Sequence, residues 1–369
     1  MVSDKLPNDL QDAIQKVIPD FDGNSSSFLT AYSFDSFDLL TLRALIEETV
    51  GIVYDDQDWM KIKTFGDFER FSKLKDSSRA EKLALSSAEL IREYRLNMPQ
   101  MNIGGLSEYW FLKEIGDMHW SLIASSLAVE SDKILDQAGN RLYATFVRIK
   151  FESKVPFSSF IENDKLKNTS KLTHFGSFYL SKCGFGNKDK FITTELATSF
   201  VARGKGNSEL FKSVPIEKNK NNLPTYNEVP AFIETYYEVR KEKTNSFKVD
   251  DVELNFGSES IFETRYQLDP YHDLNGVKLL YFAAYPHIYD VCERKFMNMK
   301  KRVDDWAMES SIMMRDIYYL GNLDLGDEII YRLRDHKEVN GAFYFLAELF
   351  RASDGKRLSM AIVKKGRSE

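Results

Sequence analysis

The spacing of apolar residues divides the chain into a short helical region and a longer region that mixes helices and strands. In the segment 37–50, apolar residues recur every three or four positions, as on one face of an amphipathic helix. These residues are Leu39, Leu42, Leu45 and Ile46. The segments 9–18 and 64–74 have a similar pattern, so we predict three helices before residue 77.

Two polar residues stand just before the helix predicted over 37–50. Either Ser36 or Asp35 can accept hydrogen bonds from the free backbone amides of its first turn. By itself, this pattern indicates a capped helix with one buried face.

The longer region contains an internal repeat. "HFGSFYLSKCG" begins at His174 and "VNGAFYFLAELF" begins at Val339, and aligning Gly176 with Gly341 offsets the two by 165 residues. Each stretch is followed by a glycine-bearing turn and another strand-like run, which predicts adjacent antiparallel strands.

An apolar, aromatic-rich helix is predicted ahead of the strands in each half, over 104–120 and 275–297. One buried helix followed by antiparallel strands, occurring twice, predicts an α+β fold with sheets wrapped around central helices. We expect the segment 77–97 to be a helical or semi-ordered linker. The connection 203–258 is expected to be a partly mobile crossover. The predicted domains are 1–76, 77–97 as linker, 98–250 and 251–369.

Composition narrows the class of protein. Hydrophobic residues make up 43% and aromatic residues 13% of the 369 positions, as in globular proteins with large cores. The apolar runs are too short to span a bilayer, and no secretory signal is visible. Two cysteines make no disulfide framework, and no residues have metal-ligand spacing. We therefore expect a cytoplasmic protein with no membrane segment and no metal.

The negative charge is concentrated at the start of the chain. Residues 1–80 contain 15 acidic and 9 basic residues, whereas the remainder contains 41 of each. This asymmetry indicates a separate module that meets basic partners, and it argues against nucleic-acid binding.

The first module resembles the four-helix acyl or peptidyl carrier proteins. "FDSFDLL" is similar to their Asp-Ser-Leu attachment motif, with Phe37 in place of the usual leucine. "ALIEETVGIVYDDQDWMKIKTFGDF" is similar to their second helix, acidic loop and third helix. The resemblance implies that Ser36 carries 4′-phosphopantetheine, with Asp35 beside it on an acidic face. It also implies a phosphopantetheinyl transferase and other biosynthetic synthase domains as partners.

The remainder resembles the double hot-dog enzymes. "DPYHDLNGVKLLYFAAYP" is similar to the loop that enters the hot-dog helix of acyl-thioester enzymes. "MPQMNIGGLSEYWFLKEIGDMHW", "GNRLYATFVRIKF" and "FIENDKL" resemble the bifunctional acyltransferase/decarboxylase of the leinamycin polyketide pathway and its relatives. This resemblance implies a coenzyme A thioester substrate, methylmalonyl-CoA or malonyl-CoA, which is decarboxylated and transferred to a carrier protein. Relatives of the fold often self-associate, which leaves a homodimer open.

Such chemistry needs hydrogen-bond donors that stabilise an enolate. We predict that backbone amides at a buried helix N-terminus supply them, at Gly276 and Val277 or at Gly105 and Leu106.

The resemblance places Tyr143 in the active site, as a transient acyl acceptor or a hydrogen-bond donor. The alternative is a packed core tyrosine, because Tyr143 shares strand parity with Val147, Ile149 and Phe151.

Four other residues are candidates with a structural alternative. His119, at the predicted end of the first helix, is either a general acid or base or a helix cap, and we favour the cap. Asp273 and Asn275 are similar to loop residues that serve many thioesterases, and both types also cap helices. Glu108 either completes a cap or faces the pocket.

Two other functions remain open. The same fold can hydrolyse an acyl thioester, or it can bind an acyl group without catalysis and pass it to a partner.

Overall fold

The computed structural model describes residues 5–15, 17–18, 20–29, 32, 42, 46, 49, 62–68, 89–204, 210–215, 223–301 and 306–367. The chain divides into two compact units, Met1–Leu85 and Ser86–Glu369.

The described part of the first unit contains helix α1 (Asn8–Gln15) and a helical turn at 65–68. Leu10, Ile14 and Phe65 are buried in a small apolar core there. Helix α1 agrees with most of the helix predicted over 9–18.

The predicted four-helix carrier bundle is not seen among these residues. Ser36 and Asp35, the predicted attachment site for phosphopantetheine, lie outside the described residues.

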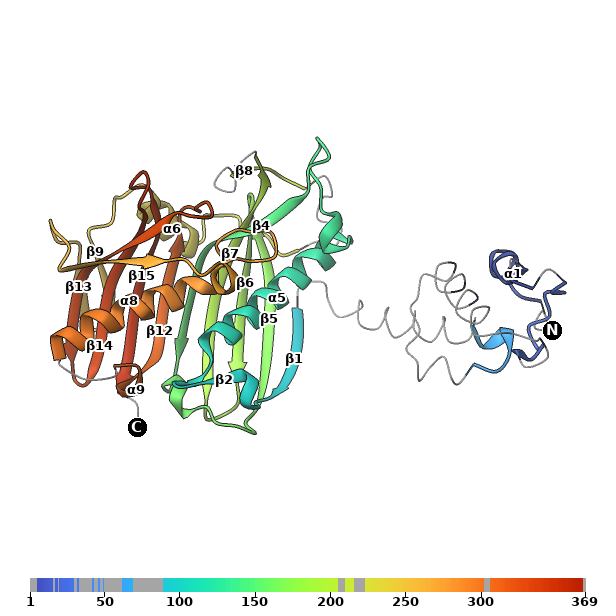
Figure 1. Cartoon of the computed structure of the whole chain (residues 1–369), viewed down its shortest axis with the longest axis horizontal. Coiled ribbons are helices and arrows are strands. Elements are labelled where there is room, and N and C mark those ends of the chain that lie inside the picture. The colour runs from blue at the N-terminus through green and yellow to red at the C-terminus, as the bar shows by residue number, and fades with distance from the viewer. Residues whose placement is uncertain are drawn as a thin grey trace. The chain divides into compact units, whose positions relative to one another are not determined.

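The second unit is built on one large antiparallel sheet (Figure 1). The strands of its first half are β1 (Glu89–Arg95), β4 (Leu142–Ser153), β5 (Lys165–Phe175), β6 (Phe178–Gly186), β7 (Phe191–Arg203) and β8 (Leu210–Lys212). Those of its second half are β11 (Phe262–Gln267), β12 (Ser310–Tyr319), β13 (Glu328–Val339), β14 (Ala342–Arg351) and β15 (Arg357–Arg367). The order is β1-β5-β6-β7-β4-β12-β15-β14-β13-β11, with β8 paired to β7.

The remaining elements are short hairpins and helices. The hairpins are β2 (Met101–Asn102) with β3 (Gly105–Leu106), and β9 (Ser246–Val249) with β10 (Val252–Asn255). The helices are α5 (Glu108–Leu127), α6 (Ala231–Arg240), α7 (Pro270–Asp273), α8 (Ala284–Lys301) and α9 (Trp306–Glu309).

The strand order is symmetric about the pair β4 and β12, and each half contributes one long helix, α5 or α8. The predicted repeat marks this symmetry. Gly176 in the β5–β6 turn and Gly341 in the β13–β14 turn both have positive φ, of 57° and 78°, which glycine adopts without strain. A long helix packed on antiparallel strands, twice over, is consistent with the predicted hot-dog arrangement, but the two predicted sheets are joined through β4 and β12 into one.

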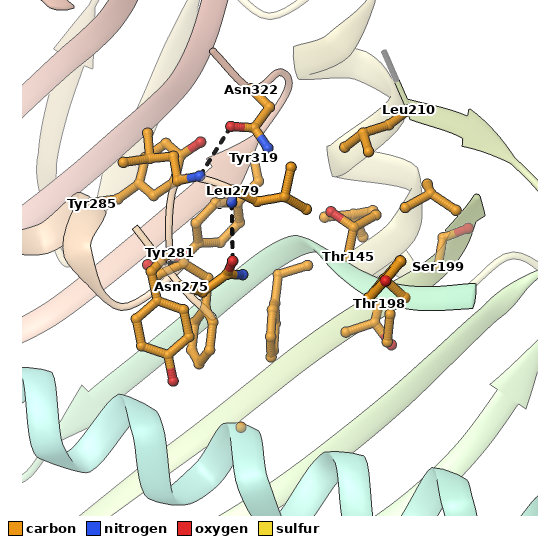
Figure 2. Close-up of a pocket in the computed structure, with 18 of the residues that line it drawn as sticks. Thr145, Thr198, Ser199, Leu210, Asn275, Leu279, Tyr281, Tyr285, Tyr319 and Asn322 are labelled. Atoms are coloured by element: carbon orange, nitrogen blue, oxygen red, sulfur yellow. Dashed lines mark hydrogen bonds between the residues drawn. The ribbon is translucent and has the colours of Figure 1, made fainter. Parts of the chain in front are cut away.

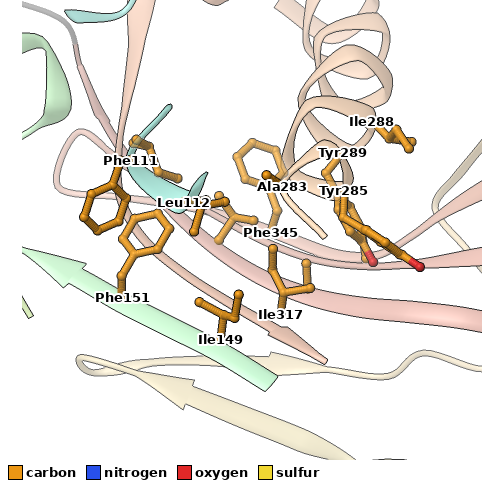
Figure 3. Packing of buried hydrophobic residues seen from close by; sticks show 14 of the residues in the cluster. Phe111, Leu112, Ile149, Phe151, Ala283, Tyr285, Ile288, Tyr289, Ile317 and Phe345 are labelled. Carbon is orange, nitrogen blue, oxygen red and sulfur yellow. The ribbon is translucent and has the colours of Figure 1, made fainter. Parts of the chain in front are cut away.

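Local capping interactions define both ends of helix α5. The hydroxyl of Ser107 accepts a hydrogen bond from the backbone N–H of Trp110, and Ala128 ends the helix in the left-handed conformation. The helix begins inside the segment predicted over 104–120 and continues to Leu127, beyond the predicted end. Phe111 and Leu112 pack in the central core, close to Phe151 (Figure 3).

Helix α8 begins at Ala284, later than the start predicted at 275. The side chain of Asn275 accepts hydrogen bonds from the backbone N–H groups of Val277 and Leu279, which holds this stretch as a loop. The apolar residues before Ala284 therefore belong to a loop.

Two connections differ from expectation. Residues 89–95 lie inside the predicted linker but form strand β1. Every residue of β1 pairs with β5. The described part of the crossover contains α6 and the β9–β10 hairpin. Phe232, Tyr236 and Leu254 from these elements pack on the face of the sheet opposite α5 and α8.

Within the described parts of the chain, no helix is long and apolar enough to cross a bilayer.

Candidate functional site

A cavity of about 570 Å³ lies between the two halves of the second unit. Gly116 and His119 of α5 line it on one face of the sheet, and Tyr236 and Arg240 of α6 line it on the other. The loop between α7 and α8 forms a further wall. The cavity therefore crosses the sheet.

A gap between the central strands makes room for the cavity. Strand β4 pairs with β12 only along 148–152, although β4 begins at Leu142. A β-bulge at Val147, between Phe146 and Arg148, shifts the register with β7. Bulges bend a strand and end its pairing. The first half of β4 thus has β7 on one side and the cavity on the other.

Two asparagine side chains face this cavity with fixed orientation (Figure 2). The Oδ1 atom of Asn275 accepts the backbone N–H of Leu279 at 3.0 Å, and the Oδ1 atom of Asn322 accepts that of Leu280 at 3.1 Å. Each oxygen also accepts a second backbone N–H. Only the oxygen of a carboxamide can accept, so the nitrogen atoms are identified as the remaining donors. Within the described part of the chain, neither nitrogen has a hydrogen-bond partner.

Aromatic rings form the apolar wall beside these amides. The rings of Phe146 and Phe282 stack with centroids 4.0 Å apart. A β-carbon at Gly116 would lie 2.5 Å from the Phe282 ring, so the glycine leaves space for this stack. The phenol rings of Tyr285 and Tyr319 also line the cavity.

His119 lies in the interior beside the cavity. Its Nδ1 atom is 2.7 Å from the Ser181 hydroxyl, and its Nε2 atom is 2.8 Å from the hydroxyl of Thr198, which also lines the cavity. Burial lowers the pKa of His119 to about 3, so the imidazole is neutral near pH 7. The prediction of a helix cap is wrong, because α5 continues to Leu127. The lowered pKa also makes His119 a weak general base near neutral pH.

Tyr143 lines the cavity from the face of the sheet opposite α5. Leu142 packs against α5, so the next residue along the strand points to the other face. Beyond the bulge at Val147 the alternation is reversed, and Ile149 and Phe151 face α5. The predicted parity of Tyr143 with Ile149 and Phe151 is therefore wrong.

The predicted backbone donors are not at helix N-termini. Gly276 and Val277 lie in the loop before α8, and the N–H of Val277 is already bonded to Asn275. Gly105 and Leu106 lie in β3, before α5. The side-chain amides of Asn275 and Asn322 are the candidate donors beside this loop.

Asp273 and Glu108 are held by polar contacts in the interior, and Asp273 also lies 2.9 Å from the His272 Nδ1 atom. The carboxylate of Asp273 is fully buried and accepts hydrogen bonds from the Tyr266 hydroxyl, at 3.0 Å, and the Asp269 N–H, at 2.9 Å. Glu108 forms a salt bridge to Arg315, at 2.7 Å.

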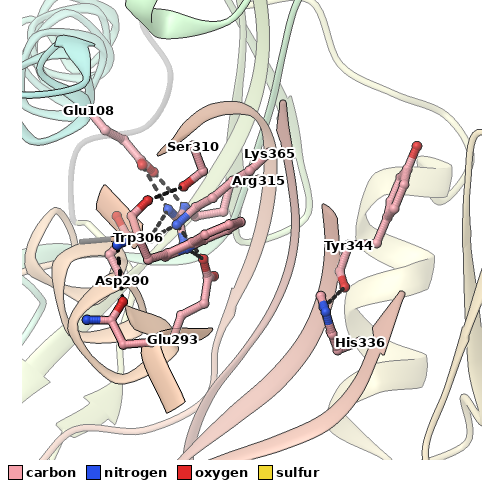
Figure 4. A network of polar contacts seen from close by, with 10 residues as sticks. Glu108, Asp290, Glu293, Trp306, Ser310, Arg315, His336, Tyr344 and Lys365 are labelled. Atoms are coloured by element: carbon pink, nitrogen blue, oxygen red, sulfur yellow. Dashed lines mark hydrogen bonds and ion pairs between the residues drawn. The ribbon is translucent and has the colours of Figure 1, made fainter. Parts of the chain in front are cut away.

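The pair of Glu108 and Arg315 belongs to a buried polar network (Figure 4). Arg315 also contacts Asp290 at 2.8 Å, and Lys365 contacts Glu293 at 2.6 Å. Burial raises the pKa of Glu108. The network joins α5, α8, β12 and β15.

Sequence reasoning missed Asn322 and Thr198. Asn322 follows a glycine after a strand, which is the pattern of an ordinary turn. Thr198 is one of several hydroxyl residues on β7, and only its contact with His119 sets it apart. Its partner is 79 residues away in the sequence.

No protein-family model matches the sequence, and no curated protein matches it. Solved structures are similar in fold. A provisionally assigned oleoyl thioesterase from Lactobacillus plantarum has a TM-score of 0.53 and 9% identity, over 77% of this chain and 97% of that one. An acyl-ACP thioesterase from Bacteroides thetaiotaomicron has a TM-score of 0.48 and 12% identity, over 75% and 97% of the two chains. The 12:0-ACP thioesterase from Umbellularia californica has a TM-score of 0.46 and 9% identity, over 76% and 97%. The first of these similarities shows that about three quarters of this chain shares its fold with that protein.

Proposed function

We propose that the second unit acts on an acyl thioester in the cavity between its halves. The proposed reaction is the decarboxylation of a malonyl-type acyl group, from methylmalonyl-CoA or malonyl-CoA, followed by acyl transfer to a carrier thiol. The observation that carries this proposal is the pair of preorganised amide donors, Asn275 and Asn322, beside an aromatic wall.

Decarboxylation places charge on the thioester oxygen. The bond between the α-carbon and the carboxylate breaks, CO2 leaves, and the electron pair forms an enolate. Donors that are already oriented stabilise that oxygen without reorganisation, an effect worth about 3 kcal/mol per donor in comparable oxyanion sites. The enolate carbon then takes a proton from solvent water. The carrier thiol attacks the carbonyl carbon, and the coenzyme A thiol leaves with the proton of the attacking thiol.

The cavity suits this reaction better than hydrolysis. Hydrolysis needs a base that activates water. Among the described residues that line the cavity, the only carboxylate is Asp117, whose side chain is 60% exposed and pairs with Arg92. His119 is neutral, and its low pKa makes it a weak base.

Tyr143 is proposed as a further donor to the substrate. Tyr143 lines the cavity, and its hydroxyl has no hydrogen-bond partner among the described residues. No base contacts it there, so donation to the thioester is chemically easier than a nucleophilic attack.

We also propose that residues 1–76 are the carrier that receives the acyl group, with 4′-phosphopantetheine on Ser36 and Asp35 next to it. The support is the spacing of the attachment motif and the acidic charge of this segment. A phosphopantetheinyl transferase and other synthase domains are then its partners, in the cytoplasm.

Intact mass spectrometry tests the reaction. The phosphopantetheinylated chain is incubated with methylmalonyl-CoA, and a propionyl adduct is expected on the carrier. Free acid would indicate a thioesterase, and unchanged thioester would indicate a binding module. Ser36→Ala should lose the adduct but still release CO2, because the cavity is intact.

Two variants of Asn275 test the donor. Asn275→Asp keeps an oxygen for the loop amides but removes the donor, so we expect CO2 release to fall by roughly a hundredfold or more. Asn275→Ala also removes the loop bonds and should lower the thermal stability. Wild-type turnover in Asn275→Asp would refute the donor role.

A further inference from the structure

The residues that line the cavity carry an excess of positive charge. Five basic residues from five separate segments line it. They are Lys113, Arg141, Lys212, Arg240 and Lys356. The single carboxylate among the described lining residues, Asp117, is already paired with Arg92 at 2.5 Å. Cations that converge on one cleft focus a positive potential there.

Among the described residues, none of these five side chains forms a salt bridge with a carboxylate, although Arg240 donates a hydrogen bond to the Tyr236 hydroxyl and the charge of Lys356 acts on nearby Asp354. Other cations near the seam do: Arg148 binds Asp316 at 2.7 Å, and Arg315 binds Glu108. Arg141 instead lies over the ring of Tyr143, with 5.2 Å between the guanidinium carbon and the ring centroid. The cations at the cavity are therefore available to an anionic ligand.

Three of the five basic residues, Arg141, Lys212 and Arg240, gather on the α6 face of the sheet. Arg141 contacts Tyr143, which faces that side. Lys212 of β8 lies 5.4 Å over the ring of Phe178, which belongs to the apolar cluster under α6. Arg240 is the last residue of α6.

The fourth residue, Lys356, comes from the turn between β14 and β15. Its neighbour Arg357 donates a hydrogen bond to the Val239 carbonyl of α6. We call these four residues, Arg141, Lys212, Arg240 and Lys356, the cationic mouth.

We propose that the cationic mouth binds the phosphate groups of a polyphosphorylated thioester of the coenzyme A type, which enters the cavity from the α6 face. This inference rests on the proposed function of the same cavity. Four cations from both halves match a ligand with several phosphates better than the single phosphodiester of a carrier arm. With its phosphates at the mouth, the ligand extends its pantetheine arm through the gap between β4 and β12. The acyl group then reaches Asn275 and Asn322.

Binding of coenzyme A itself tests the mouth without any turnover. Isothermal titration of the full chain with coenzyme A, 3′-dephospho-coenzyme A and pantetheine should give affinities that fall in that order. Affinity for coenzyme A should also fall as salt rises, since exposed charges are screened. Adenosine 3′,5′-bisphosphate, which lacks the pantetheine arm, tests whether the protein recognises the phosphates alone. Equal affinities for coenzyme A and pantetheine would overturn the proposal.

Variants locate the binding. Lys212→Ala combined with Arg240→Ala should weaken coenzyme A binding by roughly ten- to a hundredfold, and pantetheine binding much less. Lys188→Ala is the matched control, because Lys188 is exposed in the β6–β7 turn and does not line the cavity. Equal losses in the double variant and the control would refute the mouth.

Kinetics separate this inference from the proposed function. The double variant should lower kcat/KM for methylmalonyl-CoA at least tenfold more than for methylmalonyl-pantetheine. If both thioesters are decarboxylated but equally affected, the mouth is wrong and the reaction stands. If coenzyme A binds at the mouth but neither thioester reacts, the reaction is wrong and the mouth stands.

Discussion

Burial of His119 as a neutral imidazole makes the free energy of unfolding depend on pH. The side chain is 1% exposed, and burial lowers its pKa to about 3, whereas an unfolded histidine has a pKa of about 6.5. Below pH 6.5 the unfolded state therefore binds a proton that the folded state does not. The stability from this residue is complete above pH 6.5 and is lost as the pH falls from 6.5 toward 3.

The size of the effect follows from the two pKa values. At pH 5 the solution is about 1.5 pH units below the unfolded pKa. Protonation of this histidine therefore stabilises the unfolded state by about 2 kcal/mol relative to pH 7.5. A folded pKa anywhere below about 4 gives nearly the same value, because His119 stays neutral at pH 5.

His119→Gln provides the comparison, because glutamine can hydrogen-bond to both hydroxyls and does not titrate. Urea unfolding of the full chain is followed by the β-sheet signal in circular dichroism at pH 7.5 and pH 5. The wild type should lose about 2 kcal/mol more than His119→Gln between these pH values. His174→Gln is a control, because His174 is only half-buried and lies outside the hydroxyl pair that holds His119. Equal pH dependence in the wild type and His119→Gln would refute a buried neutral imidazole.

Two further predictions concern packing along the seam between β4 and β12, outside the cavity lining. Arg148→Met should cost about 3–5 kcal/mol in urea unfolding, since it leaves the Asp316 carboxylate buried without its cation, and adding Asp316→Leu should restore most of the loss. Failure of the second substitution to rescue stability would argue against a buried charge pair. Gly105→Ala should lower the melting temperature, because Gly105 has a φ of 92° and a β-carbon there would overlap the carbonyl oxygen of Phe157. Wild-type melting would contradict this close contact.

The sequence predicted those elements whose structure depends on the local spacing of apolar residues and glycines. The repeat around Gly176 and Gly341 identified two equivalent hairpins, and dense apolar spacing identified α5. The strand 89–95 was missed because charged residues interrupt its alternation, and only pairing with β5 makes it a strand. Propensity is a weak guide where tertiary pairing decides.

The site depended on contacts that local pattern does not encode. The late start of α8 follows from side-chain bonds made by Asn275, which compete with helix formation. The orientation of Tyr143 depends on a bulge at Val147, and a single inserted residue reverses the facing of every position before it. His119 is defined by hydroxyls 62 and 79 residues away.

The symmetry of the fold raises the question of why the cavity lies at one end of the seam. Strand β12 has a register shift between Ile312 and Met314, matching the bulge in β4, so the other end could also open. That end is filled. The backbone of Gly105 packs directly on the backbone at Phe157, and the backbone N–H of Ser158 donates to the Ser311 hydroxyl at 2.8 Å. The short hairpin before α5 thus closes one end, whereas the longer loop before α8 borders the open one. Divergence of these two loops leaves one of two equivalent positions available for chemistry.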